Sequence, residues 1–332
     1  MSDQNGNMKT IELHENGLDI QFRIRENGVV ELADLSSQEV KKAAMEPKED
    51  IYYPAVEIHR SGTGSLNMHA YKNNINQSSV DFVYENHELK AQAGGKELEI
   101  VMISPEKLKA VYHMRLFDGV PAVQTWTEIT NEGSEDQGLT YVSSFIYQGI
   151  SRGGDKPYYK KTDIYVPFNS WCCEAQWQKY DAETLNLNGM VIDGFNHQGY
   201  GLNRYCYSGK GTWSTCEYLP MGIAEDRETG ETYIFQIESS GQWLAEYGSA
   251  QGGNLYLALS GATEQEHGWY KNLKPGESFT TVPAGAAVVK GGLNPAAAAL
   301  TRYRRKVRRP NTDDEKLNVV FNDYMNCLMG DP

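Results

Sequence analysis

The sequence lacks the features that would place it in a membrane or in a disulfide-stabilised secreted class. Its 332 residues contain no run of about 18 apolar residues, the length that a membrane-spanning helix requires. The first ten residues, MSDQNGNMKT, contain no apolar segment of the kind found in a signal peptide. The five cysteines are odd in number and show no CxxC spacing, which argues against a disulfide framework. We therefore expect a cytoplasmic protein that does not bind membranes.

Cationic residues and catalytic motifs are also scarce. The chain has 31 Lys and Arg against 44 Asp and Glu, so its formal net charge is −13. Such an acidic balance argues against nucleic acid as a partner, because phosphate binding relies on basic side chains. The sequence contains no GxSxG motif and no phosphate-binding loop, and no cysteine has an evident histidine partner. We therefore predict no nucleophilic catalytic motif, no metal-ligand set and no cofactor in this chain, while the plentiful carboxylates leave acid–base catalysis undecided at this point.

Turn signals and alternating apolar residues dominate what remains. Asn16-Gly17 and Asn27-Gly28 separate β-prone runs, and Asn-Gly is the strongest short hairpin signal because both residues tolerate positive φ. The segments ETYIFQIES and AVQTWTEIT alternate with the period of a half-buried strand. At least ten such strand candidates precede residue 292. The pattern predicts a mainly β fold, with two stacked antiparallel sheets.

The composition changes at Asn294-Pro295, which begins a run of alanines that Pro310 closes. This pattern predicts a helix over Asn294–Arg309, with Asn294 at the N-cap and Pro295 in the first turn. Its apolar stripe would be Leu300, Tyr303 and Val307. We interpret residues 294–310 as a linker helix.

A short apolar run, Leu317–Phe321, follows the helix and is cut off by polar residues. Such a run is typical of a strand that is buried on both faces of a parallel sheet. Residues 311–332 therefore read as the start of an α/β domain.

Two tryptophans lie among polar residues and are candidates for ligand contact. Trp171 lies in NSWCCEAQW, and Trp213 lies in GTWSTCEYLPMG. Sugar-binding sites combine flat apolar rings, which stack on the sugar, with amides and carboxylates, which bind its hydroxyl groups. This is one form of the usual ligand pocket, in which apolar side chains surround a few polar groups. A tryptophan in a β-sandwich is, however, more often part of the core, and both interpretations stay open here.

Several segments together resemble one family, glycoside hydrolase family 36, the α-galactosidases or melibiases. The resemblance extends from about Tyr52 to the end of the chain. The segments that carry it are YVPFNSWCCEAQW, GTWSTCEYLPMG, LYLALSGATEQEHGWYKNLKPGESFTTVP, LTRYRRKVRRP and LNVVFNDYMNCLMGDP. It implies an N-terminal β-supersandwich domain at residues 1–293, a linker helix at 294–310, and the truncated start of a catalytic (β/α)8 barrel at 311–332.

The resemblance also implies a function. Family members cleave terminal α-linked galactose, from sugars such as melibiose and raffinose, by a retaining mechanism with two aspartates on later barrel strands. Those strands are absent here, so we expect a non-catalytic portion that is inactive alone. Asn322, Asp323 and Tyr324 would face the galactose site, and the sandwich would mediate a homo-oligomer. The alternative is a free-standing β-sandwich module for carbohydrate binding or oligomerisation.

Overall fold

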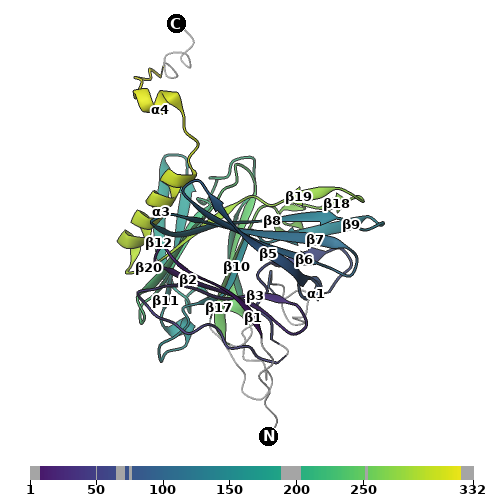
Figure 1. Ribbon diagram of the computed structural model, residues 1–332. Coiled ribbons are helices and arrows are strands. Elements are labelled where there is room, and N and C mark those ends of the chain that lie inside the picture. The colour runs from purple at the N-terminus through teal and green to yellow at the C-terminus, as the bar shows by residue number, and fades with distance from the viewer. Residues whose placement is uncertain are drawn as a thin grey trace.

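The computed structural model describes residues 8–49, 51–64, 72–74, 77–187, 203–250 and 253–322 (Figure 1). These residues form twenty strands, and every pair of neighbouring strands is antiparallel. The prediction of a mainly β, antiparallel sandwich is therefore confirmed. In the described part of the chain, no helix has both the length and the apolar character needed to cross a membrane.

The largest sheet has ten strands and forms one layer of the fold. One of the ten strands, β19 (Ser278–Thr280), lies off the main path and pairs with the C-terminal part of β8. The main path runs β12 (Cys173–Asp181), β11 (Thr162–Ser170), β14 (Met221–Asp226), β15 (Glu231–Ile237), β20 (Ala284–Lys290), β8 (Val120–Asn131), β7 (Leu108–Phe117), β6 (Gly95–Ile103) and β5 (Val83–Gln92).

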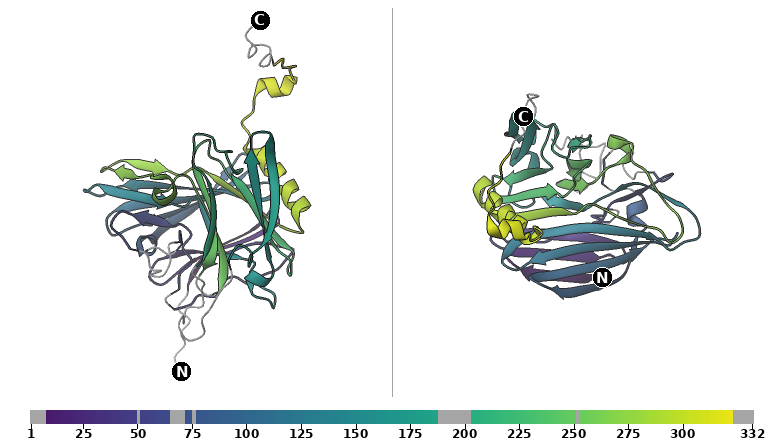
Figure 2. Two further views of the ribbon diagram at one scale, coloured as in Figure 1. Left: turned by 180° about the vertical axis from the view of Figure 1, so that it is seen from behind. Right: turned by 90° about the horizontal axis from the view of Figure 1, so that it is seen from above.

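Three smaller sheets face this layer across a shared apolar core, as the views in Figure 2 show. All four sheets contribute to one buried cluster, with Phe22, Tyr112 and Trp243 among its large members.

The short helices are α1 (Gln77–Val80) and α2 (Glu264–His267), and Tyr158–Lys160 form a 3-10 turn. The smaller sheets are β1 (Lys9–Glu15), β2 (Leu18–Ile24) and β3 (Val30–Ser37); β10 (Phe145–Ile150), β17 (Asn254–Ser260), β16 (Trp243–Ala250) and β13 (Arg204–Gly209); and β18 (Lys271–Leu273), β9 (Gln137–Val142) and β4 (Ile58–Arg60).

The predicted Asn-Gly hairpin signal is confirmed at the first turn. Asn16 and Gly17 have φ of 56° and 85° and connect β1 to β2. Two successive positive φ values belong to the tight turn whose twist matches antiparallel strands, and Asn and Gly adopt them at the least steric cost.

A buried carboxylate, Glu231 on β15, joins the first small sheet to the large one. It is fully buried, accepts a hydrogen bond from the Ser37 backbone N–H at 2.9 Å, and forms an ion pair with Lys42. The hydroxyl of Tyr233 lies 2.7 Å from a Glu231 carboxylate oxygen and 2.8 Å from the carbonyl oxygen of Leu35, so its one proton is shared between these two acceptors. Burying an unpaired charge would cost folding free energy, so the contacts that pair Glu231 also hold β3 in place against β15.

The predicted helix forms as α3 (Leu293–Val307) and lies against the outer face of the large sheet (Figure 1). Its stripe is as predicted: Leu300 and Tyr303 are buried against β8, β15 and β20, and Val307 packs beside them. The predicted cap is wrong. The helix begins at Leu293 after Gly292, with no side-chain cap, because Gly291 (φ 108°) turns the chain into the helix directly after β20.

The predicted strand over Leu317–Phe321 does not form. A short helix, α4 (Thr312–Lys316), precedes it, and Asn311 caps this helix by accepting from the N–H of Asp313 at 3.0 Å. The apolar side chains that follow are exposed; Val319, for example, is 99% exposed. A parallel strand needs a neighbour to satisfy its backbone groups, and no described strand lies beside this one.

We predict that Tyr303→Ala lowers the free energy of unfolding by about 3–5 kcal/mol, the usual cost of removing a large buried ring. Tyr303 is fully buried, meets Phe117 edge-on at 5.4 Å, and donates a hydrogen bond to Glu238. Urea denaturation measures the change. Arg302→Ala, on the exposed side of the same helix, should change stability by no more than about 0.5 kcal/mol. Equal effects of the two changes would contradict the docking of α3 through this stripe.

Candidate functional site

Both predicted tryptophans lie on the surface, on two loops that contact each other. Trp171 is in the turn between β11 and β12 and is 91% exposed. Trp213 is in the segment between β13 and β14 and is 74% exposed. Neither tryptophan is therefore a core residue. Such high exposure is unusual for tryptophan, which is mostly buried in folded proteins. We define Ser170–Cys173 and Gly211–Tyr218 as the tryptophan loops.

The other three predicted site residues do not join this surface. Asn322 lies in the exposed segment after α4. Asp323 and Tyr324 lie outside the described residues. The prediction that these three residues face a galactose site therefore stays a prediction.

Asn169, at the end of β11, holds the two tryptophan loops together. Its backbone N–H donates to the carbonyl of Glu217 at 2.7 Å, and its side-chain amide donates to the carbonyl of Thr215 at 2.5 Å. Its side-chain oxygen accepts from the N–H of Ala175 on β12 at 3.0 Å. One amide side chain thus bridges the hairpin and the neighbouring loop, which fixes the backbones that carry Trp171 and Trp213.

A series of aromatic contacts connects these loops to the core. Phe168 packs on Tyr218 with ring centroids 5.1 Å apart, and Tyr218 lies 5.4 Å from Tyr207. Tyr207 meets the buried Trp243 edge-on at 5.8 Å. The indole N–H of Trp243 donates to the carbonyl of Ser214 at 2.6 Å. The loops therefore rest on a packed base, and the two exposed rings project from a supported backbone.

The backbone of this region is also strained at three positions. Cys172, Ala175 and Glu217 have φ of 61°, 52° and 44°, values in the left-handed region that favours glycine. Such strain persists only where surrounding contacts hold it, and it clusters at functional sites. The hydrogen bonds of Asn169 are contacts of that kind.

This surface carries side chains of the kinds that are common in binding sites. The segments that carry the two exposed rings also carry the exposed side chains of Glu174, Gln176 and Glu217. Burial raises the pKa of Tyr218, which moves this phenol further from ionisation than an exposed tyrosine, and the neutral phenol can donate a hydrogen bond. Rings with neighbouring carboxylates and amides can stack on the apolar face of a sugar, or can pack into a protein interface.

A second feature, a cleft of about 580 Å³, was not predicted. Residues 39–48 form much of its wall, together with Tyr53, Arg152, Asn254 and Lys290. Two cationic side chains of the lining are already paired within the protein: Lys42 with Glu231, and Arg152 with Asp34. No sequence pattern pointed to this cleft, because its walls come from segments that are far apart in the chain. The tryptophan loops remain the stronger candidate, since their rings have no cover among the described residues.

Comparisons with known proteins support the fold. No family model matches this chain, and no curated protein matches it. Among solved structures, the α-galactosidase AgaB from Geobacillus stearothermophilus, of glycoside hydrolase family 36, matches with a TM-score of 0.71 and 14% identity, over 98% of this chain and 46% of that one. An α-galactosidase from Lactobacillus brevis matches with a TM-score of 0.65 and 14% identity, over 92% of this chain and 42% of that one.

A smaller protein has the same fold over nearly its whole length. The galactose mutarotase-like protein from Clostridium acetobutylicum matches with a TM-score of 0.50 and 13% identity, over 85% of this chain and 96% of that one. This chain thus spans less than half the length of the two α-galactosidases. At such identities the matches show the fold alone.

We predict that Asn169→Ala frees the two tryptophan loops from each other. The Ala175 amide loses its acceptor and the Thr215 carbonyl loses its donor, so local opening should cost about 1–2 kcal/mol less. Amide exchange in residues 171–178 should then accelerate by about tenfold, measured by hydrogen exchange with mass spectrometry. The matched control is Gln176→Ala, which removes an exposed amide whose hydrogen bond within the described residues goes to the nearby carbonyl of Glu174. Unchanged exchange in Asn169→Ala would show that other contacts hold the loops.

Proposed function

We propose that this chain is the non-catalytic, N-terminal β-supersandwich portion of an α-galactosidase-like retaining glycoside hydrolase. The enzyme would remove terminal α-linked galactose from oligosaccharides such as melibiose and raffinose. The observation that carries the proposal is the match to AgaB, which takes in 98% of this chain but only 46% of that enzyme. The order of the elements, a large sandwich followed by the docked helix α3, agrees with this role.

The proposal assigns the chemistry to residues beyond this chain. Retaining hydrolysis needs two carboxyl groups about 5–5.5 Å apart on either side of the scissile bond. In a (β/α)8 barrel such groups lie at the carboxyl ends of the barrel strands. The sandwich would support the barrel through α3, and Asn322, Asp323 and Tyr324 would lie where the first barrel strand ends. The exposed segment 317–322 would then become a buried strand once its barrel neighbours are present.

In the assembled enzyme, which we expect in the cytoplasm, the tryptophan loops would form a contact surface. Two exposed rings on a supported backbone lose little conformational entropy on binding, which suits an interface. We propose that Trp171 and Trp213 contact a neighbouring subunit of a homo-oligomer or the sugar held there.

A second candidate is a free-standing carbohydrate-binding or oligomerisation module. The specific observation in its favour is the galactose mutarotase-like protein, whose length is matched to 96%. A sandwich of this extent therefore exists as a protein of its own. In this case the tryptophan loops would bind sugar without a barrel.

The size of the native product distinguishes the two candidates. We expect an antibody raised against this chain to detect, in the source cells, a band of about twice the 37.3 kDa of the sequence, because this chain matches only 46% of the length of AgaB. The isolated chain should show no turnover of an α-galactoside substrate. A native band at 37.3 kDa would contradict the first candidate and favour the module.

A sugar titration tests the tryptophan loops directly. If the sugar site needs the barrel, we expect no change in the tryptophan fluorescence of this chain at high millimolar galactose or raffinose. A change that Trp171→Ala or Trp213→Ala abolishes would instead support the module. Tyr270→Ala is the matched control, since Tyr270 is a 53% exposed aromatic residue outside these loops. All three variants replace exposed side chains and should fold.

A further inference from the structure

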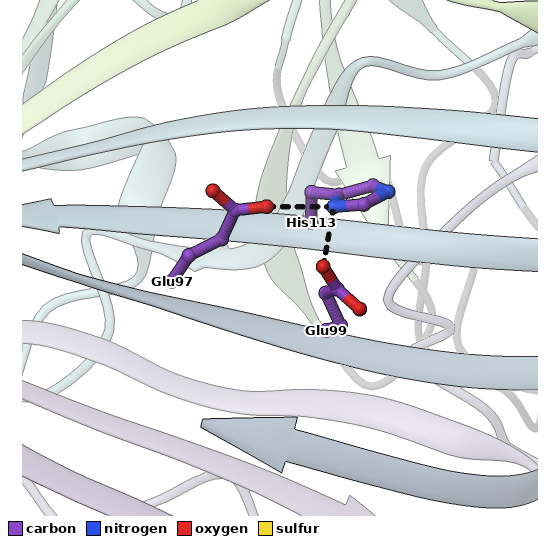
Figure 3. A group of neighbouring side chains, drawn as sticks. All are labelled: Glu97, Glu99 and His113. Carbon is purple, nitrogen blue, oxygen red and sulfur yellow. Dashed lines mark hydrogen bonds and ion pairs between the residues drawn. The ribbon is translucent and has the colours of Figure 1, made fainter. Parts of the chain in front are cut away.

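Two carboxylates and an imidazole meet on the outward face of the large sheet, away from the tryptophan loops. Glu97 and Glu99 lie two residues apart on β6, so both side chains leave the same face of the strand. His113 on β7 is the cross-strand partner of Glu99. Figure 3 shows both carboxylates directed toward one nitrogen of the His113 ring.

The spacing of these atoms matches the coordination shell of a small divalent cation. His113 Nδ1 lies 3.0 Å from Glu97 Oε1 and 3.9 Å from Glu99 Oε1. The three candidate ligand atoms all lie within 4.8 Å of one another. A tetrahedral zinc site with bonds of about 2.0–2.1 Å places its ligand atoms about 3.4 Å apart. Shifts of about 1 Å or less would therefore bring all three atoms to bonding distance.

Each carboxylate is already oriented by a neighbour on β5. Gln92 Nε2 donates to Glu97 Oε2 at 2.5 Å, and Lys90 Nζ donates to Glu99 Oε2. In both cases the bonded oxygen is the one that does not face His113. The Oε1 atoms are thereby left directed at the imidazole. Hydrogen bonds that orient ligating carboxylates in this way are typical of metal sites.

The His113 ring is held by stacking. It lies on the indole of Trp126 from β8, with centroids 4.7 Å apart and planes 8° from parallel. Metal-bound histidines usually donate their second nitrogen to an acceptor. Here Nε2 is buried without a hydrogen-bond partner among the described residues, so Trp126 takes over the orienting role. Within the described residues, the two carboxylates are the ion-pair partners of this ring.

The side chains are also well shielded from solvent. The exposed fractions are 9% for the Glu97 side chain, 22% for Glu99 and 12% for His113. Nδ1 can hold only one proton, and Glu99 Oε1 at 3.9 Å is too far away to accept it. The Oε1 atom of Glu99 therefore has no hydrogen bond to the imidazole, although Lys90 pairs with the other oxygen of this carboxylate. A divalent cation between the three side chains would be bound by both Oε1 atoms and by Nδ1 at once.

We propose that Glu97, Glu99 and His113 form a binding site for a divalent metal ion of the zinc type. One imidazole nitrogen and two carboxylate oxygens suit this class of cation better than Mg²⁺ or Ca²⁺, which prefer shells made of oxygen alone. The three ligands leave a fourth position for water or for a group from a partner molecule. Three neighbouring strands position the ligands and the supporting Trp126, so the site needs little rearrangement.

The test is titration of the full chain with ZnCl2 in a calorimeter. Cys172, Cys173 and Cys216 are exposed thiols that would bind zinc themselves, so these three and Cys327 are replaced by serine in every sample. We expect one Zn²⁺ per chain and a higher melting temperature with zinc, because a ligand of the folded state stabilises it. We expect Ca²⁺ and Mg²⁺ to bind at least tenfold more weakly.

His113→Gln and Glu99→Gln should each weaken zinc binding at least tenfold and remove the zinc-dependent rise in melting temperature. Glu99 is the more exposed residue, so its variant keeps the test valid if His113→Gln folds poorly. The matched control is His14→Gln. His14 also has two carboxylate neighbours, but Asp19 is 2.8 Å from Nδ1 and Glu12 is 3.7 Å from Nε2, so the two carboxylates face different nitrogens. The proposal would be overturned by loss of zinc binding in His14→Gln, by equal binding in the parent, His113→Gln and Glu99→Gln, or by no zinc binding to the parent.

Discussion

A ten-stranded antiparallel sheet has two faces, and every apolar stretch on either face must be covered. The three smaller sheets cover the inner face and form the main core with it. On the outer face, α3 covers the strands β8, β15 and β20. The outer face over β6 and β7 lies beyond α3 and carries the polar side chains of Glu97, Glu99 and His113 beside half-buried apolar ones such as Val101 and Val111. The polar cluster thus lies on a part of the outer face that α3 leaves uncovered.

The same sheet has an edge, and the tryptophan loops lie there. β12 is an exposed edge strand, and exposed edges invite pairing with other chains unless they are protected. Charged and polar side chains along β12 reduce that risk. The turn before it concentrates apolar area in Trp171, beside Trp213 on the adjoining loop. A localised apolar surface on a polar edge is suited to one specific contact rather than to general aggregation.

Local signals predicted what depends on neighbouring residues in the chain. The Asn16-Gly17 turn and the stripe of α3 follow from φ preferences and helical period, and both are present as predicted. Predictions failed where the outcome depends on what lies nearby in space. Leu317–Phe321 has the composition of a buried strand, yet it is exposed because the described residues provide no partner strand. Asn294 has the right chemistry for a cap, but the glycines after β20 start the helix before it.

The sequence by itself determined the class of the fold, the turns and the faces of each strand, because these follow from alternation and backbone preference. It could place Glu97 and Glu99 on one face, since they are two residues apart. Only the tertiary structure decided that His113 lies opposite them, because strand register is set by pairing across the whole sheet. It also decided that Trp243 is buried and Trp171 exposed. Two tryptophans with identical side chains thus have different roles. The burial of each depends on which elements pack around it, and those elements are brought together only by folding.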